Sequence, residues 1–276
     1  LAPQVRRCRG VTPWLYLHLM GHILAIANQK GGVGKTTTVV NLGAALAERG
    51  QHVLLVDLDP QGALTACSGL DPYSLTPTTY SLLTQDGMTL GQIVRPIGER
   101  LWLAPGSVDL AAAEYQLMSR ADRARRLADP LRSEADQVAF VLIDTPPSLG
   151  LLTVNALTAA DAVIVPVECR YLAMRGIRAI LYTVGTVRER LNPSLDLLGL
   201  LPTMHQPASM HSRQVVEELR AAFGGRVFET VIEMDEALAT APAARMPVIA
   251  HRPASAGAAA YRHLASEVES RCITRE

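Results

Sequence analysis

Short apolar runs recur along the chain, and most are followed by a segment with the spacing of a helix. Five runs have the length of buried strands, and they lie at 23–27, 53–56, 138–143, 162–166 and 197–201. Their apolar residues are nearly continuous instead of alternating with polar ones, which is typical of parallel strands covered on both faces. The pattern therefore predicts a parallel sheet between two layers of helices.

Helices are predicted where apolar residues recur every three or four positions. The first predicted helix begins at Thr36, ends before Gly50, and has Val39, Leu42 and Leu46 on its inner side. Further helices are predicted at 107–128, 171–191, 212–223 and 255–270. A weak strand is expected at 101–103, and residues 69–98 are rich in the Thr, Gly and Pro of loops and short helices.

Alternating strands and helices imply βαβ units with right-handed crossovers. The predicted fold class is α/β, with a doubly wound, mostly parallel sheet flanked by helices. A chain of 276 residues with no repeats fits one large domain of this kind, predicted to span 20–276.

The first 19 residues differ from the rest of the chain. A basic segment precedes a short apolar one, as in a signal peptide, but Pro13 and His18 interrupt it and no small-residue cleavage site follows. We expect residues 1–19 to be a non-native or disordered extension, with Met20 as the natural initiator. A peripheral anchor is the alternative interpretation.

Charge and cysteine content narrow the classes of function. The 26 basic and 26 acidic residues cancel, so any nucleic-acid surface must be a local patch. No apolar run approaches the roughly 18 residues of a membrane span. Four cysteines without paired spacing favour reduced thiols over a disulfide framework or a metal site. Together these features predict a cytoplasmic protein with no membrane partner.

Lysine occurs at only two positions, Lys30 and Lys35, whereas arginine occurs at 24. Both lysines lie in a glycine-rich segment between the first strand and the first helix, which is the setting of a phosphate-binding loop. Its backbone N–H groups would cradle phosphates, Lys35 would reach the β- and γ-oxygens, and the Thr36 hydroxyl would bind Mg²⁺. The predicted nucleotide-binding residues are Lys30, Gly31, Gly32, Val33, Gly34, Lys35, Thr36 and Thr37.

Three aspartates follow predicted strands. Ligands of doubly wound sheets bind at the carboxyl ends of the strands, where Asp57, Asp59 and Asp144 all fall. Asp144 comes after four apolar residues, as in a Walker B motif, and is expected to hold the Mg²⁺ shell. One such aspartate is as readily a turn residue, but three around one phosphate-binding loop point to a nucleotide site.

Lys30 distinguishes this loop from an ordinary one and resembles the signature lysine of the deviant Walker A (ParA/MinD) ATPases. The chain resembles the ParA/Soj chromosome and plasmid partition ATPases in particular, over roughly 22–270. The matching segments are 27–38, 53–62, 142–150, 155–161, 214–219 and 257–261.

This resemblance implies an ATPase that uses ATP and Mg²⁺ and closes into a homodimer. Lys30 would reach the partner's phosphates, and Asp59 would position the attacking water. Asp57 would support either the Mg²⁺ shell or the loop. A ParB-like partner would stimulate slow hydrolysis and release the dimer from non-specific DNA. The protein would then be nucleoid-associated while bound to DNA.

Two segments depart from the family pattern. Residues 205–209 and 232–242 lack the arginines that help relatives bind DNA. The second segment also touches adenine in the family, so Glu233 and Asp235 are nucleotide-binding candidates. Arg213 and Arg220, seven residues apart, would share one helix face. The candidate DNA contacts are Arg213, Arg220, Arg226, Arg245 and Arg252.

Alternative functions follow from these departures. The arginines are as readily solvated side chains beside Glu217 and Glu218. An orphan ATPase of this type would position a protein cargo, and a third possibility is a nucleotide-binding scaffold with little turnover. Membrane cycling of the MinD kind is disfavoured because residues 259–276 carry mixed charges and small apolar groups.

Overall fold

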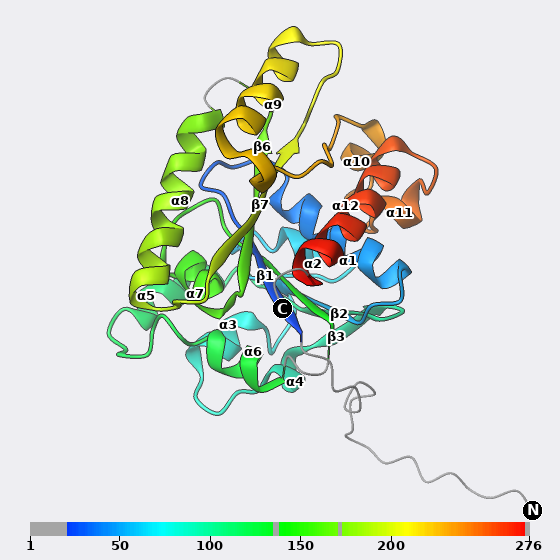
Figure 1. Cartoon of the computed structure of the whole chain (residues 1–276). Coiled ribbons are helices and arrows are strands. Elements are labelled where there is room, and N and C mark those ends of the chain that lie inside the picture. Colours follow the sequence, from blue (N-terminus) through cyan, green and yellow to red (C-terminus); the bar gives the residue numbers. More distant parts are fainter. Residues whose placement is uncertain (1–20, 135–137, 171–172, 274–276) are drawn as a thin grey trace, which may run out of the picture.

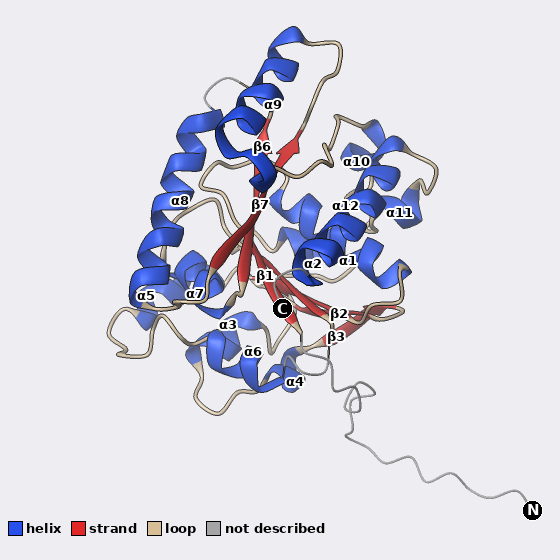
Figure 2. Ribbon diagram, viewed as in Figure 1, coloured by secondary structure: helices blue, strands red, loops and turns tan. Residues whose placement is uncertain are grey.

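The computed structural model describes residues 21–134, 138–170 and 173–273. The extension predicted at 1–19 lies outside them. One seven-stranded sheet runs through the molecule with helices on both faces (Figures 1 and 2). Its strands are β1 (His22–Ile26), β2 (Val53–Asp57), β3 (Arg95–Gly98), β4 (Leu101–Ala104), β5 (Phe140–Asp144), β6 (Ala162–Glu168) and β7 (Asp196–Thr203).

The strand order is β3-β4-β2-β5-β1-β6-β7. Every neighbouring pair is parallel except β3 and β4, which are antiparallel. The central strands β1, β2 and β5 are almost wholly buried, as their continuous apolar sequences require. The predicted fold class, a doubly wound and mostly parallel sheet, is confirmed.

Two apolar cores fill the space between the sheet and its helices. One core holds the inner faces of α1 (Lys35–Glu48), α2 (Ala63–Cys67), α10 (Glu236–Thr240), α11 (Val248–His251) and α12 (Ala256–Ile273). The fully buried Tyr261 of α12 belongs to this core.

The opposite face of the sheet carries the remaining helices. They are α3 (Thr79–Thr84), α4 (Leu90–Ile93), α5 (Leu110–Leu117), α6 (Ala128–Glu134), α7 (Leu151–Ala159), α8 (Ala173–Arg190) and α9 (Met210–Phe223), with a 3₁₀ turn at Gly224–Arg226. None of the helices in the described residues is both long enough and apolar enough to span a membrane.

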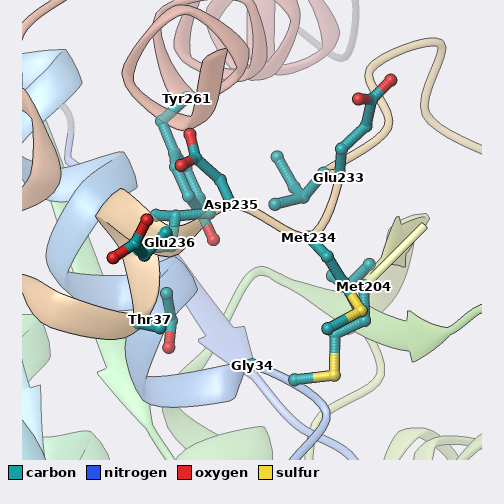
Figure 3. A pocket seen from close by; sticks show the side chains of 12 residues that line it. Gly34, Thr37, Met204, Glu233, Met234, Asp235, Glu236 and Tyr261 are labelled. Atoms are coloured by element: carbon teal, nitrogen blue, oxygen red, sulfur yellow. The ribbon is translucent and has the colours of Figure 1, made fainter. Parts of the chain in front are cut away.

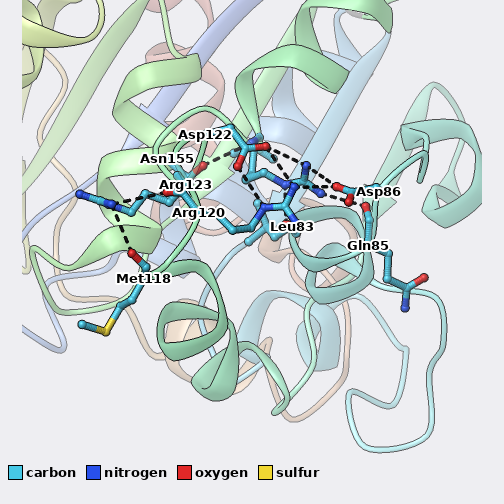
Figure 4. A network of polar contacts seen from close by, with 10 residues as sticks. Leu83, Gln85, Asp86, Met118, Arg120, Asp122, Arg123 and Asn155 are labelled. Atoms are coloured by element: carbon cyan, nitrogen blue, oxygen red, sulfur yellow. Dashed lines mark hydrogen bonds and ion pairs between the residues drawn. The ribbon is translucent and has the colours of Figure 1, made fainter.

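The helix predicted at 107–128 is wrong in its length. It is interrupted, because α5 ends at Leu117 and α6 begins only at Ala128. Between them the backbone bonds to a distant side chain: Asn155 Nδ2 donates to the Arg123 carbonyl at 2.8 Å, and Leu127 N–H donates to Asn155 Oδ1 at 3.3 Å. Figure 4 shows this turn. These long-range bonds replace the helical ones.

The sheet register sets the geometry of the site. In the pairing of β2 with β5, Asp57 lies opposite Asp144, and in the pairing of β1 with β5, Ile26 lies opposite Asp144. The last residues of three central strands are therefore level with one another. The loop after β1 begins at this same edge, where ligands of such sheets bind.

Candidate nucleotide-binding site

The glycine-rich loop joins β1 to α1 and curls over the carboxyl edge of the sheet. Gly32 and Gly34 have φ values of 71° and 90°, in the left-handed region that glycine adopts without strain. Gly34 is the residue before the first turn of α1, so the unpaired N–H groups of that turn face the loop. The predicted phosphate-binding geometry is therefore present in the backbone.

Lys35 lies inside the loop and is only 6% exposed. Its Nζ donates to the carbonyl oxygen of Lys30 at 3.3 Å, which spans the loop. Burial lowers the pKa of Lys35, while the nearby carboxylates of Asp144 and Asp59 oppose that shift. An anionic phosphate in the loop would add to their effect and favour the charged ammonium.

Thr36 and Asp144 are in contact where the phosphate-binding loop enters α1. The Thr36 hydroxyl donates to Asp144 Oδ2 at 2.7 Å, and Asp144 is fully buried. Its other oxygen, Oδ1, has no hydrogen-bond partner among the described residues. Burial, followed by repulsion from Asp57, raises the pKa of Asp144 well above its usual range. A hydroxyl and a buried carboxylate with one unpaired oxygen suit the oxygen-only shell of Mg²⁺.

Asp57 is also buried, but both its oxygens are occupied. Oδ1 accepts from the Asp59 N–H at 3.1 Å, while Oδ2 accepts from the Thr65 N–H and hydroxyl at 2.9 and 2.7 Å. Burial raises the pKa of Asp57 to about 6, although these hydrogen bonds act to lower it. Of the two roles expected for Asp57, this bonding favours support of the loop after β2.

Asp59 lies in that loop and is 8% exposed. Its Oδ1 accepts the Gln61 N–H at 2.9 Å. The Asp59 carboxylate acts to raise the pKa of Lys35, so the two side chains interact electrostatically. The β2 loop thus presents a carboxylate towards the nucleotide site.

Lys30 projects from the loop rim, and its side chain is 51% exposed. The ammonium does not enter the loop of its own chain. Instead it pairs with Glu168 Oε2 at 2.5 Å, at the end of β6. Lys30 and Lys35 therefore occupy different environments, one on the rim and one inside.

A pocket of about 370 Å³ opens beside the loop. Gly34 and Thr37 form one wall, and the segment from Ile232 to Ala239 forms another. Figure 3 shows the Tyr261 ring at the back, with Met204 and Met234 together on one side. A mostly apolar pocket next to a phosphate-binding loop has the shape and chemistry to take a nucleobase.

Glu233 and Asp235 both line this pocket, as the sequence predicted for residues near the base. The Glu233 side chain is directed away from Gly34 and Thr37 (Figure 3). Asp235 Oδ1 accepts the Ala237 N–H at 2.8 Å and Oδ2 accepts the Gly257 N–H at 2.7 Å, so this carboxylate joins α10 to α12. Their roles in nucleotide binding stay predictions.

The pocket residues that were not among the predicted site residues include Met204, Met234 and Tyr261. Met204 directly follows β7, so its position after a strand end was the one available signal. Tyr261 reads as an ordinary core residue of a terminal helix, and its hydroxyl lies 3.3 Å from Thr38 Oγ1. Met234 lies in the segment 232–242 that was expected near adenine, between the named candidates Glu233 and Asp235, but it was not itself named.

The five candidate DNA-contacting arginines do not form one patch in a single chain. Arg213 in α9 donates to the Pro207 carbonyl at 2.5 Å. Arg220 pairs with Glu229 at 3.3 Å, and Arg226 pairs with Asp196 at 2.9 Å at the amino end of β7. Arg245 and Arg252 are exposed on the other side of the sheet, before and after α11. Their role stays a prediction.

Comparisons with known proteins agree with this geometry. A family model described as an AAA domain matches residues 21–197. The sporulation initiation inhibitor protein Soj of Bacillus subtilis is 43% identical over 249 residues, which are 90% of this chain and 98% of Soj. The chromosome partitioning protein ParA of Caulobacter vibrioides (strain NA1000 / CB15N) is 42% identical over 251 residues, 90% of this chain and 94% of that ParA.

A solved structure shares the whole fold. It is cobyrinic acid a,c-diamide synthase from Mycobacterium smegmatis with bound ADP and magnesium. The two structures superpose with a TM-score of 0.82 at 40% sequence identity, over 93% of this chain and 97% of that one. With a P-loop on a doubly wound sheet and this identity to Soj and ParA over nearly its full length, the chain belongs to the ParA/Soj family of P-loop ATPases.

Proposed function

We propose that this protein is a Mg²⁺-dependent ATPase that dimerises on ATP and acts in chromosome or plasmid partition. The observation that carries the proposal is the contact of Thr36 with a buried Asp144 whose second oxygen lacks a partner among the described residues. That arrangement lies directly under a loop shaped for phosphates. Identity to Soj and ParA supplies the class of process.

The nucleotide would bind with its phosphates in the loop and its base in the pocket beside Tyr261. Lys35 would leave the Lys30 carbonyl and turn its ammonium to the β- and γ-oxygens. Backbone N–H groups from Gly31 to Thr36 would hold the other oxygens. The M. smegmatis neighbour binds ADP and magnesium, which supports a nucleotide as the ligand of this fold.

Thr36 and Asp144 would hold Mg²⁺, either directly or through water. When bound, this ion neutralises charge on the phosphate oxygens and makes the terminal phosphate a better electrophile. Asp144 would bind the ion as a carboxylate. Burial disfavours that charged form, and a bound cation would favour it.

Hydrolysis needs a water in line with the terminal phosphate. Asp59 would orient that water from the β2 loop, while Asp57 would hold the loop through Thr65. Lys30 would reach the phosphates of the second subunit, so that ATP joins the dimer. Turnover would be slow until a ParB-like partner orders these groups.

DNA binding in the ATP state would require arginines from both subunits, because one chain brings at most two of the candidates together on one element. Arg213 and Arg220 share α9 and are the best-placed pair. If no DNA binding accompanies ATP, positioning of a protein cargo is the better assignment. A scaffold role applies only if turnover is absent as well.

Phosphate release by the wild-type chain tests the proposal. We expect slow Mg²⁺-dependent release from ATP with water as the acceptor, faster with DNA and a ParB-like partner, and none in Lys35→Ala, which also loses ATP binding. A synthase would release phosphate only with an acid and an amide-nitrogen donor present. Strict dependence on such co-substrates would contradict the assignment.

A further inference from the structure

The register of β1 and β6 continues past the end of β1 into the phosphate-binding loop, alongside the last residues of β6. Within the sheet, Leu24 pairs with Ala162 and Ile26 pairs with Ile164. Further along, Asn28 Nδ2 donates to the Pro166 carbonyl at 2.7 Å, and Lys30 Nζ donates to Glu168 Oε2 at 2.5 Å. Every pair is separated by the same 138 residues. The rim lysine is therefore held in register with the end of β6.

Each carboxylate oxygen of Glu168 forms an ion pair with a different side chain. Lys30 Nζ lies 2.5 Å from Oε2, and Arg170 Nε lies 3.0 Å from Oε1. The Glu168 side chain is only 10% exposed, whereas those of Lys30 and Arg170 are 51% and 59% exposed. A carboxylate this shielded from water is costly to leave unpaired. Arg170 would keep it paired if Lys30 left.

The backbone of Lys30 is fixed independently of its ammonium. Its N–H donates to Asn28 Oδ1 at 3.0 Å, and Asn28 is 5% exposed. The base of the side chain is therefore anchored, while its exposed end is held by one ion pair. Such a side chain can adopt two conformations while its backbone stays fixed. In one it pairs with Glu168, and in the other it extends away from its own subunit.

We propose that Glu168 is a positioning residue that retains Lys30 in the resting subunit and sets the ATP concentration and protein concentration at which the dimer closes. The proposal rests on the cross-subunit role of Lys30 given under Proposed function. On closure, the phosphates of the partner's ATP take the ammonium from Glu168, and Arg170 remains as the counter-ion of that carboxylate.

The size of the effect follows from the exposure of the pair. A half-exposed ion pair changes an equilibrium by about three- to fivefold. Because both subunits must release a lysine, the two effects multiply, and the dimer dissociation constant should change by about 10- to 25-fold. That range is readily measured.

The experiment compares dimer dissociation constants in Mg–ATP by sedimentation velocity. Glu168→Gln keeps the shape and removes the charge, so it should tighten the dimer by about 10- to 25-fold. Arg170→Gln should weaken it, because Lys30 becomes the last cation on Glu168. Glu189→Gln, at an exposed carboxylate of α8, controls for net charge and should match the wild type.

The rate of lysine acetylation reports on the contact between Lys30 and Glu168 without requiring a dimer. The chain has only two lysines, so peptide mass spectrometry resolves both. Without nucleotide, Glu168→Gln should raise the acetylation rate at Lys30 by about three- to fivefold and leave Lys35 unchanged. An unchanged Lys30 rate, or an ATP dimer no tighter than wild type, overturns the proposal. A wild type that never dimerises refutes the proposed function instead, while the acetylation result still decides whether Glu168 retains Lys30.

Discussion

Asp57 and Asp144 lie opposite each other on neighbouring strands, yet their hydrogen bonding separates their roles. Asp57 uses one oxygen to hold the loop after β2 and the other to hold Thr65 in α2, whereas Asp144 has one oxygen without a partner among the described residues, beside Thr36. The sequence was enough to predict that all three aspartates lie at strand ends, because an apolar run and the residues that follow it can be recognised locally. It left open which carboxylate holds a loop, because that depends on Thr65, eight residues further on.

Asp59→Ala is expected to slow hydrolysis by about 100-fold and leave ATP binding unchanged, because orienting a water contributes nothing to ground-state affinity. The ATP dimer should accumulate as a result. Single-turnover phosphate release and sedimentation in the same buffer measure the two effects. Wild-type turnover in this variant would remove Asp59 from the mechanism.

At the scale of elements, the parallel strands were predicted closely. β3, however, lies in the segment 69–98 that was expected to hold loops and short helices, and one predicted helix was wrong in its length. Runs such as 53–56 and 162–166 become β2 and β6 because continuous apolar sequence has few alternatives beside a sheet. The segment 118–127 has helical spacing but is pinned by Asn155 from α7. That contact joins residues about 30 positions apart, which no local pattern reveals.

Asn155 should therefore matter more for stability than the charged network beside it. It is fully buried and also donates to the Leu151 carbonyl at 2.9 Å, so Asn155→Ala leaves several buried groups unpaired. We expect a loss of about 2–3 kcal/mol in the free energy of unfolding, measured in urea.

The matched control is Asp86→Ala. Asp86 joins Arg120 and Arg126 in the network of Figure 4, but it is exposed to solvent. Exposed ion pairs contribute little because water screens them. The urea midpoint of unfolding of Asp86→Ala should therefore stay near that of the wild type. Equal losses in the two variants would show that the turn is held by its surface charges instead of by Asn155.

At the scale of the whole molecule, the chain has no net charge and its candidate DNA-binding arginines are dispersed. Arg213 and Arg220 lie about 10 Å apart along α9, and each is bonded to a neighbouring group of its own chain. A surface that binds phosphates must then be assembled from two subunits. DNA binding should follow dimerisation and not precede it.

The double variant Arg213→Ala/Arg220→Ala is expected to lose ATP-dependent binding to non-specific DNA while keeping turnover without DNA. Wild-type binding should weaken steeply with salt, because phosphate contacts release counterions. Fluorescence anisotropy with a labelled duplex at several salt concentrations measures both. Binding that ignores ATP, or survives the double change, would place the DNA surface elsewhere.

The most direct test of the account is the mass of the protein in Mg–ATP, measured by sedimentation for wild type and Lys30→Ala. Lys30 lies on the loop rim, outside the place where its own chain would hold phosphates. We predict that wild type becomes a dimer with ATP and stays a monomer with ADP, whereas Lys30→Ala still binds ATP but stays a monomer. An unchanged ATP dimer in Lys30→Ala would contradict the account.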